Sequence, residues 1–134
     1  MAQKTYALGQ RYIGAGQSDG TIILNEVPGN ALGAYLDGAN IIVNCSAQDA
    51  TGDTMNAGEI TIHGSTGDAA GYAMRGGAIY VQGDAGYRAG IHMKEYKEKV
   101  PVLVIGGRTG SFLGEYQAGG IIIVLGIGSE DRQP

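Results

Sequence analysis

The segment Glu59-Ile-Thr-Ile-His63 alternates apolar and polar residues, a pattern typical of a β-strand that buries one face. The same pattern stands one repeat earlier, in Asn40-Ile-Ile-Val-Asn44, and one repeat later, in Ala78-Ile-Tyr-Val-Gln82, so the repeat is nineteen residues long. Nineteen residues hold one strand and its turns but leave no room for a crossover helix. We therefore expect successive strands to stack in parallel, as the coils of a solenoid.

Glycine anchors extend this repeat in both directions. Gly33, Gly52, Gly71 and Gly90 follow one another at the same nineteen-residue interval, and Gly114 follows after a longer gap, which indicates five inserted residues. Counted from the anchors, positions three, eight and ten are apolar in nearly every coil. They predict three buried ladders: Leu36, Met55, Met74 and Met93; Ile41, Ile60 and Ile79; Val43, Ile62 and Val81. Gln117 stands where the first ladder predicts methionine.

These columns predict an all-β fold, a single-stranded right-handed parallel β-helix of about five to six coils. The right hand is expected because connections between parallel strands almost always take it. Residues 1–20 are predicted to form an N-terminal cap, residues 21–128 the β-helix and residues 129–134 a C-terminal tail. The two residues before each anchor, such as Ala50-Thr51, could give a second brief strand in each coil.

The composition excludes several classes of function. The chain has 134 residues, of which 25 are glycine and one is cysteine, and its formal net charge of −4 argues against a nucleic-acid partner. The single Cys45 cannot form a disulfide within the chain or build a zinc or iron–sulfur site from cysteines. No apolar run approaches the ~18 residues of a membrane span, and residues 1–12 lack an apolar signal core. We expect a cytoplasmic protein without membrane contact.

Three kinds of polar residue invite a chemical interpretation. Asp49 and Asp68 share a column and could act as an acid–base pair, but their place in a turn favours capping of backbone groups. His63 falls in an outward polar column. Cys45 takes the position of a corner glycine, and no histidine is placed to activate it. We predict no catalytic, cofactor-binding or metal-binding residue in this chain.

The densest polar segment, residues 87–99, ends in the insertion. Arg75 and Lys94 share a column, and Arg88 and His92 are expected close by. Such a group of cations could contact an anion or a partner carboxylate, or the segment could be a solvated loop of alternating charge.

The most apolar run of the chain, residues 119–126, belongs to the last coil. Two interpretations stand side by side. The run is either a fully buried strand or a surface that another chain covers, including a second copy that associates through the apolar terminal coil.

Two longer segments resemble a known family. Gly71-Tyr-Ala-Met-Arg-Gly-Gly-Ala-Ile-Tyr-Val-Gln-Gly83, followed by Gly90-Ile-His-Met-Lys-Glu-Tyr96, is similar to the GXGXG domain at the C-terminus (domain 3) of the glutamate synthase large subunit. The later Phe112-Leu-Gly-Glu-Tyr116 and Ala118-Gly-Gly120 extend the resemblance, which covers roughly residues 28–128. The chain resembles the form of this domain that some microbes carry as a separate polypeptide.

The resemblance implies a structural or assembly subunit that is not an enzyme on its own. The complex would be a glutamate synthase, an oxidoreductase acting on CH-NH2 donors in glutamate biosynthesis and nitrogen assimilation. Its partners would be an FMN-binding synthase subunit and a glutaminase (amidotransferase) subunit, and these would carry the FMN and the iron–sulfur cluster. Two alternatives stay open: a scaffold in a related complex, such as the C subunit of formylmethanofuran dehydrogenase or a part of glutamate N-methyltransferase, and a carbohydrate-active β-helix.

Overall fold

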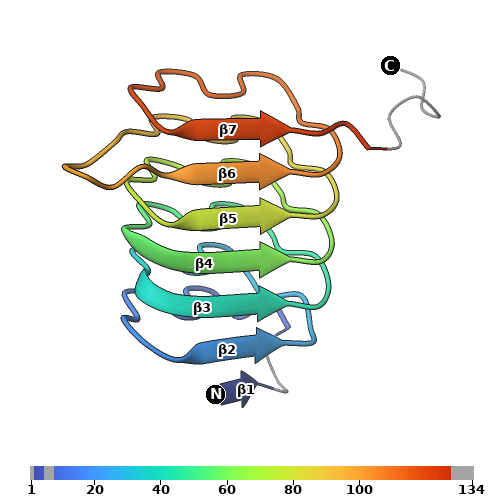
Figure 1. Cartoon of the computed structure of the whole chain (residues 1–134). Coiled ribbons are helices and arrows are strands. Elements are labelled where there is room, and N and C mark those ends of the chain that lie inside the picture. Colours follow the sequence, from blue (N-terminus) through green and yellow to red (C-terminus); the bar gives the residue numbers. More distant parts are fainter. Residues whose placement is uncertain (1, 5–7, 128–134) are drawn as a thin grey trace.

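The fold, seen in a computed structural model that describes residues 2–4 and 8–127, is a single-stranded parallel β-helix. Within these residues one parallel sheet holds the strands in chain order, and no helix is present (Figure 1). The strands are β1 (Ala2–Lys4), β2 (Thr21–Leu24), β3 (Asp37–Val43), β4 (Ala57–Ile62), β5 (Ala78–Val81), β6 (Val102–Ile105) and β7 (Ile121–Val124). The predicted fold class is therefore confirmed.

The winding is right-handed. In Figure 1 the chain runs from left to right along each strand, returns behind the sheet and rises one level toward the C-terminus. The register follows the predicted columns, because Ile41 pairs with Ile60 and Ile60 with Ile79. Ile79 then pairs with Leu103, so the five extra residues fall between β5 and β6.

The core consists of the predicted ladders, stacked along the inside of the rod. Strand residues alternate inward and outward, and the inward isoleucines and valines of β3, β4 and β5 are buried. The side chains of the methionine ladder, Leu36, Met55, Met74 and Met93, are also fully buried. Burial of these side chains is the main stabilising contribution of the fold.

A glutamine stands at each end of the methionine ladder. Gln17 lies one coil before Leu36, and Gln117 lies one coil after Met93. The side-chain amide of Gln17 donates to the Asp19 carbonyl at 3.0 Å, and that of Gln117 donates to the Gly119 carbonyl at 3.2 Å. The departure of Gln117 from the methionine pattern thus has a physical reason. Among the described residues no further coil packs against either glutamine, and each amide binds a carbonyl two residues ahead.

The prediction of a second brief strand in each coil is wrong. The residues before each anchor lie in turns where every second residue has a positive φ, as at Ala50 (58°), Gly52 (72°) and Thr54 (54°). These turns still bond to both neighbours in the stack. The amide of Ala50 donates to the Asp68 carbonyl of the next coil at 2.8 Å, and that of Gly52 to the Leu32 carbonyl of the previous one at 2.7 Å.

The structure describes the predicted N-terminal cap in part but not the predicted C-terminal tail. Residues 8–20 repeat the turns of the later coils, since Tyr12 and Gly14 have positive φ and Ile13 is buried. Their role as an N-terminal cap stays a prediction, as does the boundary at residue 128. The predicted tail, residues 129–134, lies outside the described residues.

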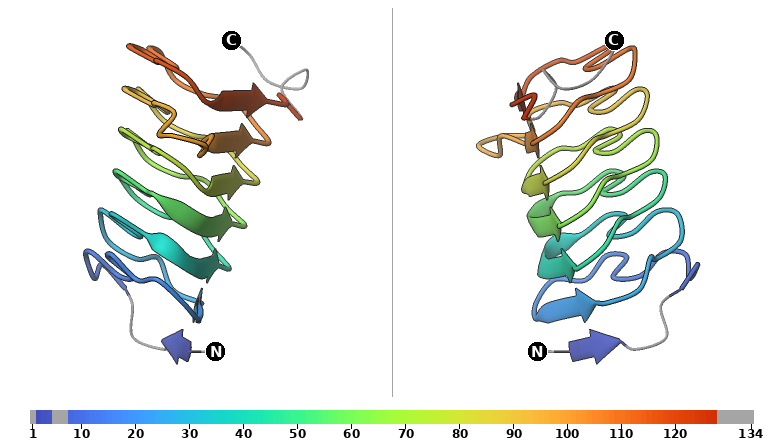
Figure 2. Two further views of the ribbon diagram at one scale, coloured as in Figure 1. Left: turned by 60° about the vertical axis from the view of Figure 1, so that its left-hand side comes forward. Right: turned by 90° about the vertical axis from the view of Figure 1, so that its right-hand side faces the viewer.

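The insertion leaves the rod as a short hairpin. Tyr96 and Lys99 exchange two backbone hydrogen bonds, at 3.1 and 2.9 Å, and residues 94–100 are exposed. Figures 1 and 2 show this loop projecting beyond the stacked coils, beside the start of β6. In the part of the chain that the structure describes, no helix has the length and apolar character needed to cross a membrane.

Candidate partner-binding surfaces

The side chains of the acidic column at the turns accept hydrogen bonds from backbone amides. The Oδ1 atom of Asp49 accepts the Asp68 amide at 2.7 Å, and that of Asp68 accepts the Tyr87 amide at 2.9 Å. Asn30 bonds the Asp49 amide in the same way, at 3.1 Å. Each side chain thus caps the next coil, which confirms the capping interpretation of Asp49 and Asp68. A parallel column of Ser46, Ser65 and Asp84 does the same work.

A matched pair of substitutions separates capping from acid–base chemistry. Asp68→Ala removes the acceptor for the Tyr87 amide and should lower the free energy of unfolding by about 1 kcal/mol, whereas Asp68→Asn keeps an acceptor and should cost less than about 0.5 kcal/mol. Urea titration monitored by circular dichroism measures both. Equal losses for alanine and asparagine would show that charge, and not hydrogen bonding, is what this position requires.

His63 and Cys45 have structural surroundings too. The Nδ1 atom of His63 lies 3.3 Å from Oε1 of Gln82, one coil ahead in the outward polar column. Burial, together with the charge of Glu26, raises the pKa of the Cys45 thiol above its ordinary value. A raised pKa lowers the thiolate fraction at neutral pH, which disfavours a nucleophilic role.

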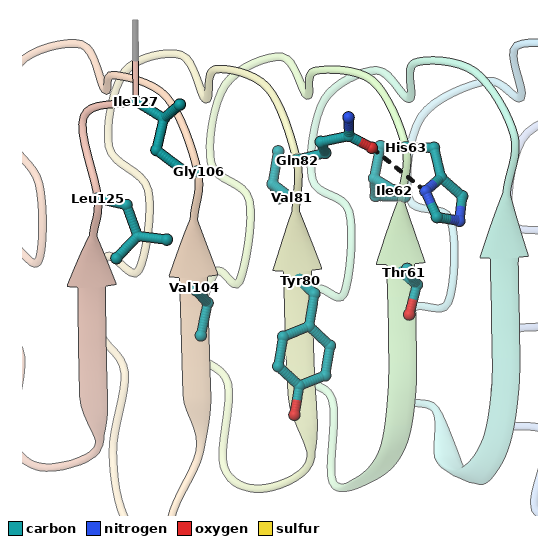
Figure 3. A pocket seen from close by; sticks show the side chains of 10 residues that line it. All are labelled: Thr61, Ile62, His63, Tyr80, Val81, Gln82, Val104, Gly106, Leu125 and Ile127. Atoms are coloured by element: carbon teal, nitrogen blue, oxygen red, sulfur yellow. Dashed lines mark hydrogen bonds between the residues drawn. The ribbon is translucent and has the colours of Figure 1, made fainter. Parts of the chain in front are cut away.

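An apolar groove of about 300 Å³ lies on the outer face of the sheet, over β4 to β7. Figure 3 shows Tyr80 on β5, Val104 on β6 and Leu125 just after β7, with His63 and Gln82 at the polar border. The outer face is therefore polar toward β4 and apolar toward β7, so its character changes along the rod.

The four predicted contact residues separate into two pairs. Arg75 and Lys94, together with Glu95 and Tyr96, line a hollow of about 220 Å³ at the foot of the inserted hairpin. Arg88 and His92 lie in the turns instead, among aromatic rings. Binding of a partner or an anion by any of the four stays a prediction.

Arg88 and His92 belong to a cluster that we call the ring cluster: Tyr72, Arg88, His92, Phe112 and Tyr116. The Cζ atom of Arg88 lies 4.9 Å from the centroid of the Phe112 ring, within cation–π range. The His92 ring stacks on Tyr116 with 4.9 Å between centroids and 15° between planes. Tyr72 approaches His92 edge-on at 5.8 Å. The side chains of Phe112 and Tyr116 are 53% and 70% exposed.

Four members of the ring cluster adopt backbone angles that bulky residues avoid. The φ angles are 57° at Arg88, 57° at His92, 66° at Phe112 and 58° at Tyr116. A residue with a Cβ loses roughly 1–2 kcal/mol in this region. The turn itself does not require large side chains, because Ala31, Ala50 and Ala69 occupy the Arg88 column and Gly16 and Ala73 the His92 column.

Sequence reasoning missed the three aromatic members of this cluster. Phe112 and Tyr116 stand one coil after Arg88 and His92, but the insertion lengthens the interval between those two coils. The anchors Gly90 and Gly114 already put Phe112 in the column of Arg88, and the same spacing puts Tyr116 in the column of His92. No pattern in the sequence announces the ring geometry itself.

The C-terminal end of the rod is apolar and open among the described residues. β7 pairs with β6 alone of the described strands, and its outward and inward faces are both accessible. Ile122 is only partly buried, and Val124, Leu125 and Ile127 are exposed by 39%, 57% and 69%. The interpretation of residues 119–126 as a fully buried strand is therefore wrong within the described residues.

Together, the stacked ladders and the turns with positive φ define a right-handed parallel β-helix of nineteen-residue coils, with exposed apolar and aromatic side chains at its C-terminal end. The chain belongs to the GXGXG motif family, whose model matches residues 1–131. It is 58% identical over 122 residues to an uncharacterized protein of Methanocaldococcus jannaschii, an alignment that covers 90% of this chain. The chain spans about half of that relative, 47% of its length. No solved structure matches the chain.

Proposed function

We propose that this chain is a non-catalytic assembly subunit of a glutamate synthase-type, FMN-dependent oxidoreductase complex. The observation that carries the proposal is the open C-terminal end of the described rod. An apolar edge strand such as β7 is a template for another chain and is normally covered. Membership of the GXGXG motif family, and the likeness of residues 71–96 and 112–120 to the glutamate synthase domain, point to the partners.

In this proposal the chemistry lies in the other chains. A glutaminase subunit releases ammonia, and a synthase subunit with FMN and an iron–sulfur cluster adds it to 2-oxoglutarate and reduces the product. The β-helix supplies a rigid support between them, because every coil is bonded to both neighbours and the core is continuous. Coupling of two active sites depends on how firmly they are held relative to each other.

Co-purification from the native host tests the proposal. The tagged chain is expected to bring down a yellow flavoprotein and an amidotransferase, and the eluate should form glutamate from glutamine and 2-oxoglutarate when a reductant is present. Recovery of formylmethanofuran dehydrogenase or glutamate N-methyltransferase subunits would instead favour the alternative scaffold role. Recovery of the tagged chain alone would overturn the proposal.

A lysine in the edge strand should block the interface. Ile123 lies in β7 with its side chain 43% exposed, so Ile123→Lys can keep its ammonium in water while charging the apolar edge. We expect its affinity for the co-purified subunits to fall by about tenfold or more. The matched control is Ile42→Lys, which changes the same outward column in β3, far from the open end. Equal binding by both variants would place the interface elsewhere.

A further inference from the structure

The ring cluster presents a cation whose hydrogen-bonding capacity is unused. Within residues 2–4 and 8–127 the Arg88 guanidinium has no hydrogen bond or ion pair, and its contact is with the Phe112 ring. A guanidinium carries five N–H donors in a fixed planar arrangement that matches a carboxylate. Stacking on Phe112 restricts its orientation before any partner arrives, which reduces the entropy lost on binding.

The ring cluster adjoins the open C-terminal end. Phe112 is followed directly by Leu113, whose side chain is 39% exposed at the last rung of the core. A partner that covers the end of the rod therefore reaches the exposed rings of Phe112 and Tyr116 without leaving the surface.

In the coils just before the ring cluster, the same turn face carries small side chains. Alanine occupies the Arg88 column in the three preceding coils, and Thr54 and Ala73 occupy the His92 column in the two preceding coils. Tyr12 and Tyr35 place single rings on this face in the first two coils, whereas the last two coils stack Arg88 on Phe112 and His92 on Tyr116. Alanine or glycine satisfies these turns, so the fold alone does not account for a cation stacked on a ring beside further exposed rings.

We infer that the ring cluster is the binding hot spot for a protein partner that places a carboxylate against Arg88 and an apolar side chain against Phe112 and Tyr116. Arginine and tyrosine are among the residues most enriched at such hot spots. Local charge decides the class of partner: a second copy placed ring cluster to ring cluster would set Arg88 against Arg88, whereas a carboxylate on a different protein complements the guanidinium. This inference rests on the proposed function, and it assigns the surface through which the assembly subunit contacts its partner.

Binding of purified FMN-containing synthase and amidotransferase subunits to the immobilised chain tests the inference. Arg88→Glu is expected to weaken one of the two interactions by about 100-fold, and Arg88→Ala and Tyr116→Ala by about tenfold each. The wild-type affinity should also fall as salt is raised, more than that of Arg88→Ala. Thermal melts should stay close to wild type, because alanine already occupies these columns in other coils.

Tyr35→Ala is the matched control. Tyr35 shares the turn column of His92 and Tyr116, has a φ of 58° and is 59% exposed, but it lies three coils before His92. It should bind like wild type. If the wild-type chain binds a subunit and the Arg88 and Tyr116 variants bind it equally well, this inference alone is overturned. If the wild-type chain binds neither subunit, the proposed function is overturned as well. Self-association abolished by Arg88→Glu, seen by sedimentation, would assign the surface to a second copy and overturn the inference.

Discussion

Replacing Gly58 with alanine is expected to lower the free energy of unfolding by about 2–5 kcal/mol. Gly58 lies at the start of β4 with a φ of 98°, a conformation that L side chains rarely adopt. An added Cβ would overlap the carbonyl oxygen of Ala39 in the preceding coil and lie 2.9 Å from the Gly38 carbonyl carbon. These are backbone atoms fixed in the stack, so neither can move aside without disturbing the ladder.

Gly16→Ala provides the control for this substitution. Gly16 also has a positive φ, 69°, but a Cβ there would meet nothing within 4 Å. Gly16→Ala should lower the free energy of unfolding only through the strain of a positive φ, by about 1 kcal/mol. Guanidinium titrations of both variants give the difference. Equal losses would show that φ alone, and not the closeness of the coils, selects glycine at position 58.

Ile60→Ala should cost about 2–5 kcal/mol, because Ile60 is fully buried at the middle of the isoleucine ladder, between Ile41 and Ile79. The cavity cannot collapse easily, since the strands on both sides hold the coil at the sheet spacing. In a solenoid each coil contacts only its neighbours, so the loss also weakens the coupling between the two halves of the rod.

Two controls bracket the Ile60 prediction. Thr61→Ala changes the outward neighbour and should stay within about 0.5 kcal/mol of wild type. Ile122→Ala removes the same side chain at the open end, where it is only partly buried, and should cost about 1–2 kcal/mol. Denaturant titration with hydrogen exchange would resolve all three. A larger loss at Ile122 than at Ile60 would contradict the stacked core.

The ladders could be predicted from the sequence because a solenoid repeats one environment many times. Ile41, Ile60 and Ile79 each face the same neighbours, so one residue type satisfies all three positions and a fixed spacing results. The left-handed turns could not be predicted in the same way. Glycine signals a positive φ, but Ala50 and Arg88 adopt it as well, because the hydrogen bonds of the stack outweigh their local preference.

The candidate surface was predicted only in part, for a related reason. Arg75 with Lys94 could be paired from their shared column, and the structure places both in one hollow. Arg88 and His92 could be singled out by charge, but their partners Phe112 and Tyr116 come from the next coil, beyond the insertion. The anchor Gly114 gives the register beyond the insertion, but a column of unlike residues gives no sign that its members stack face to face.

The two glutamines that close the methionine ladder bear on how far such rods can grow. Copies joined head to tail would place Gln117 of one molecule against Gln17 of the next and extend the stack into an open filament. That junction would seal two amides inside a dry seam, each of which already bonds a carbonyl of its own chain. Methionine at the same positions would carry no such desolvation cost. The amides therefore oppose polymerisation of identical copies through the core.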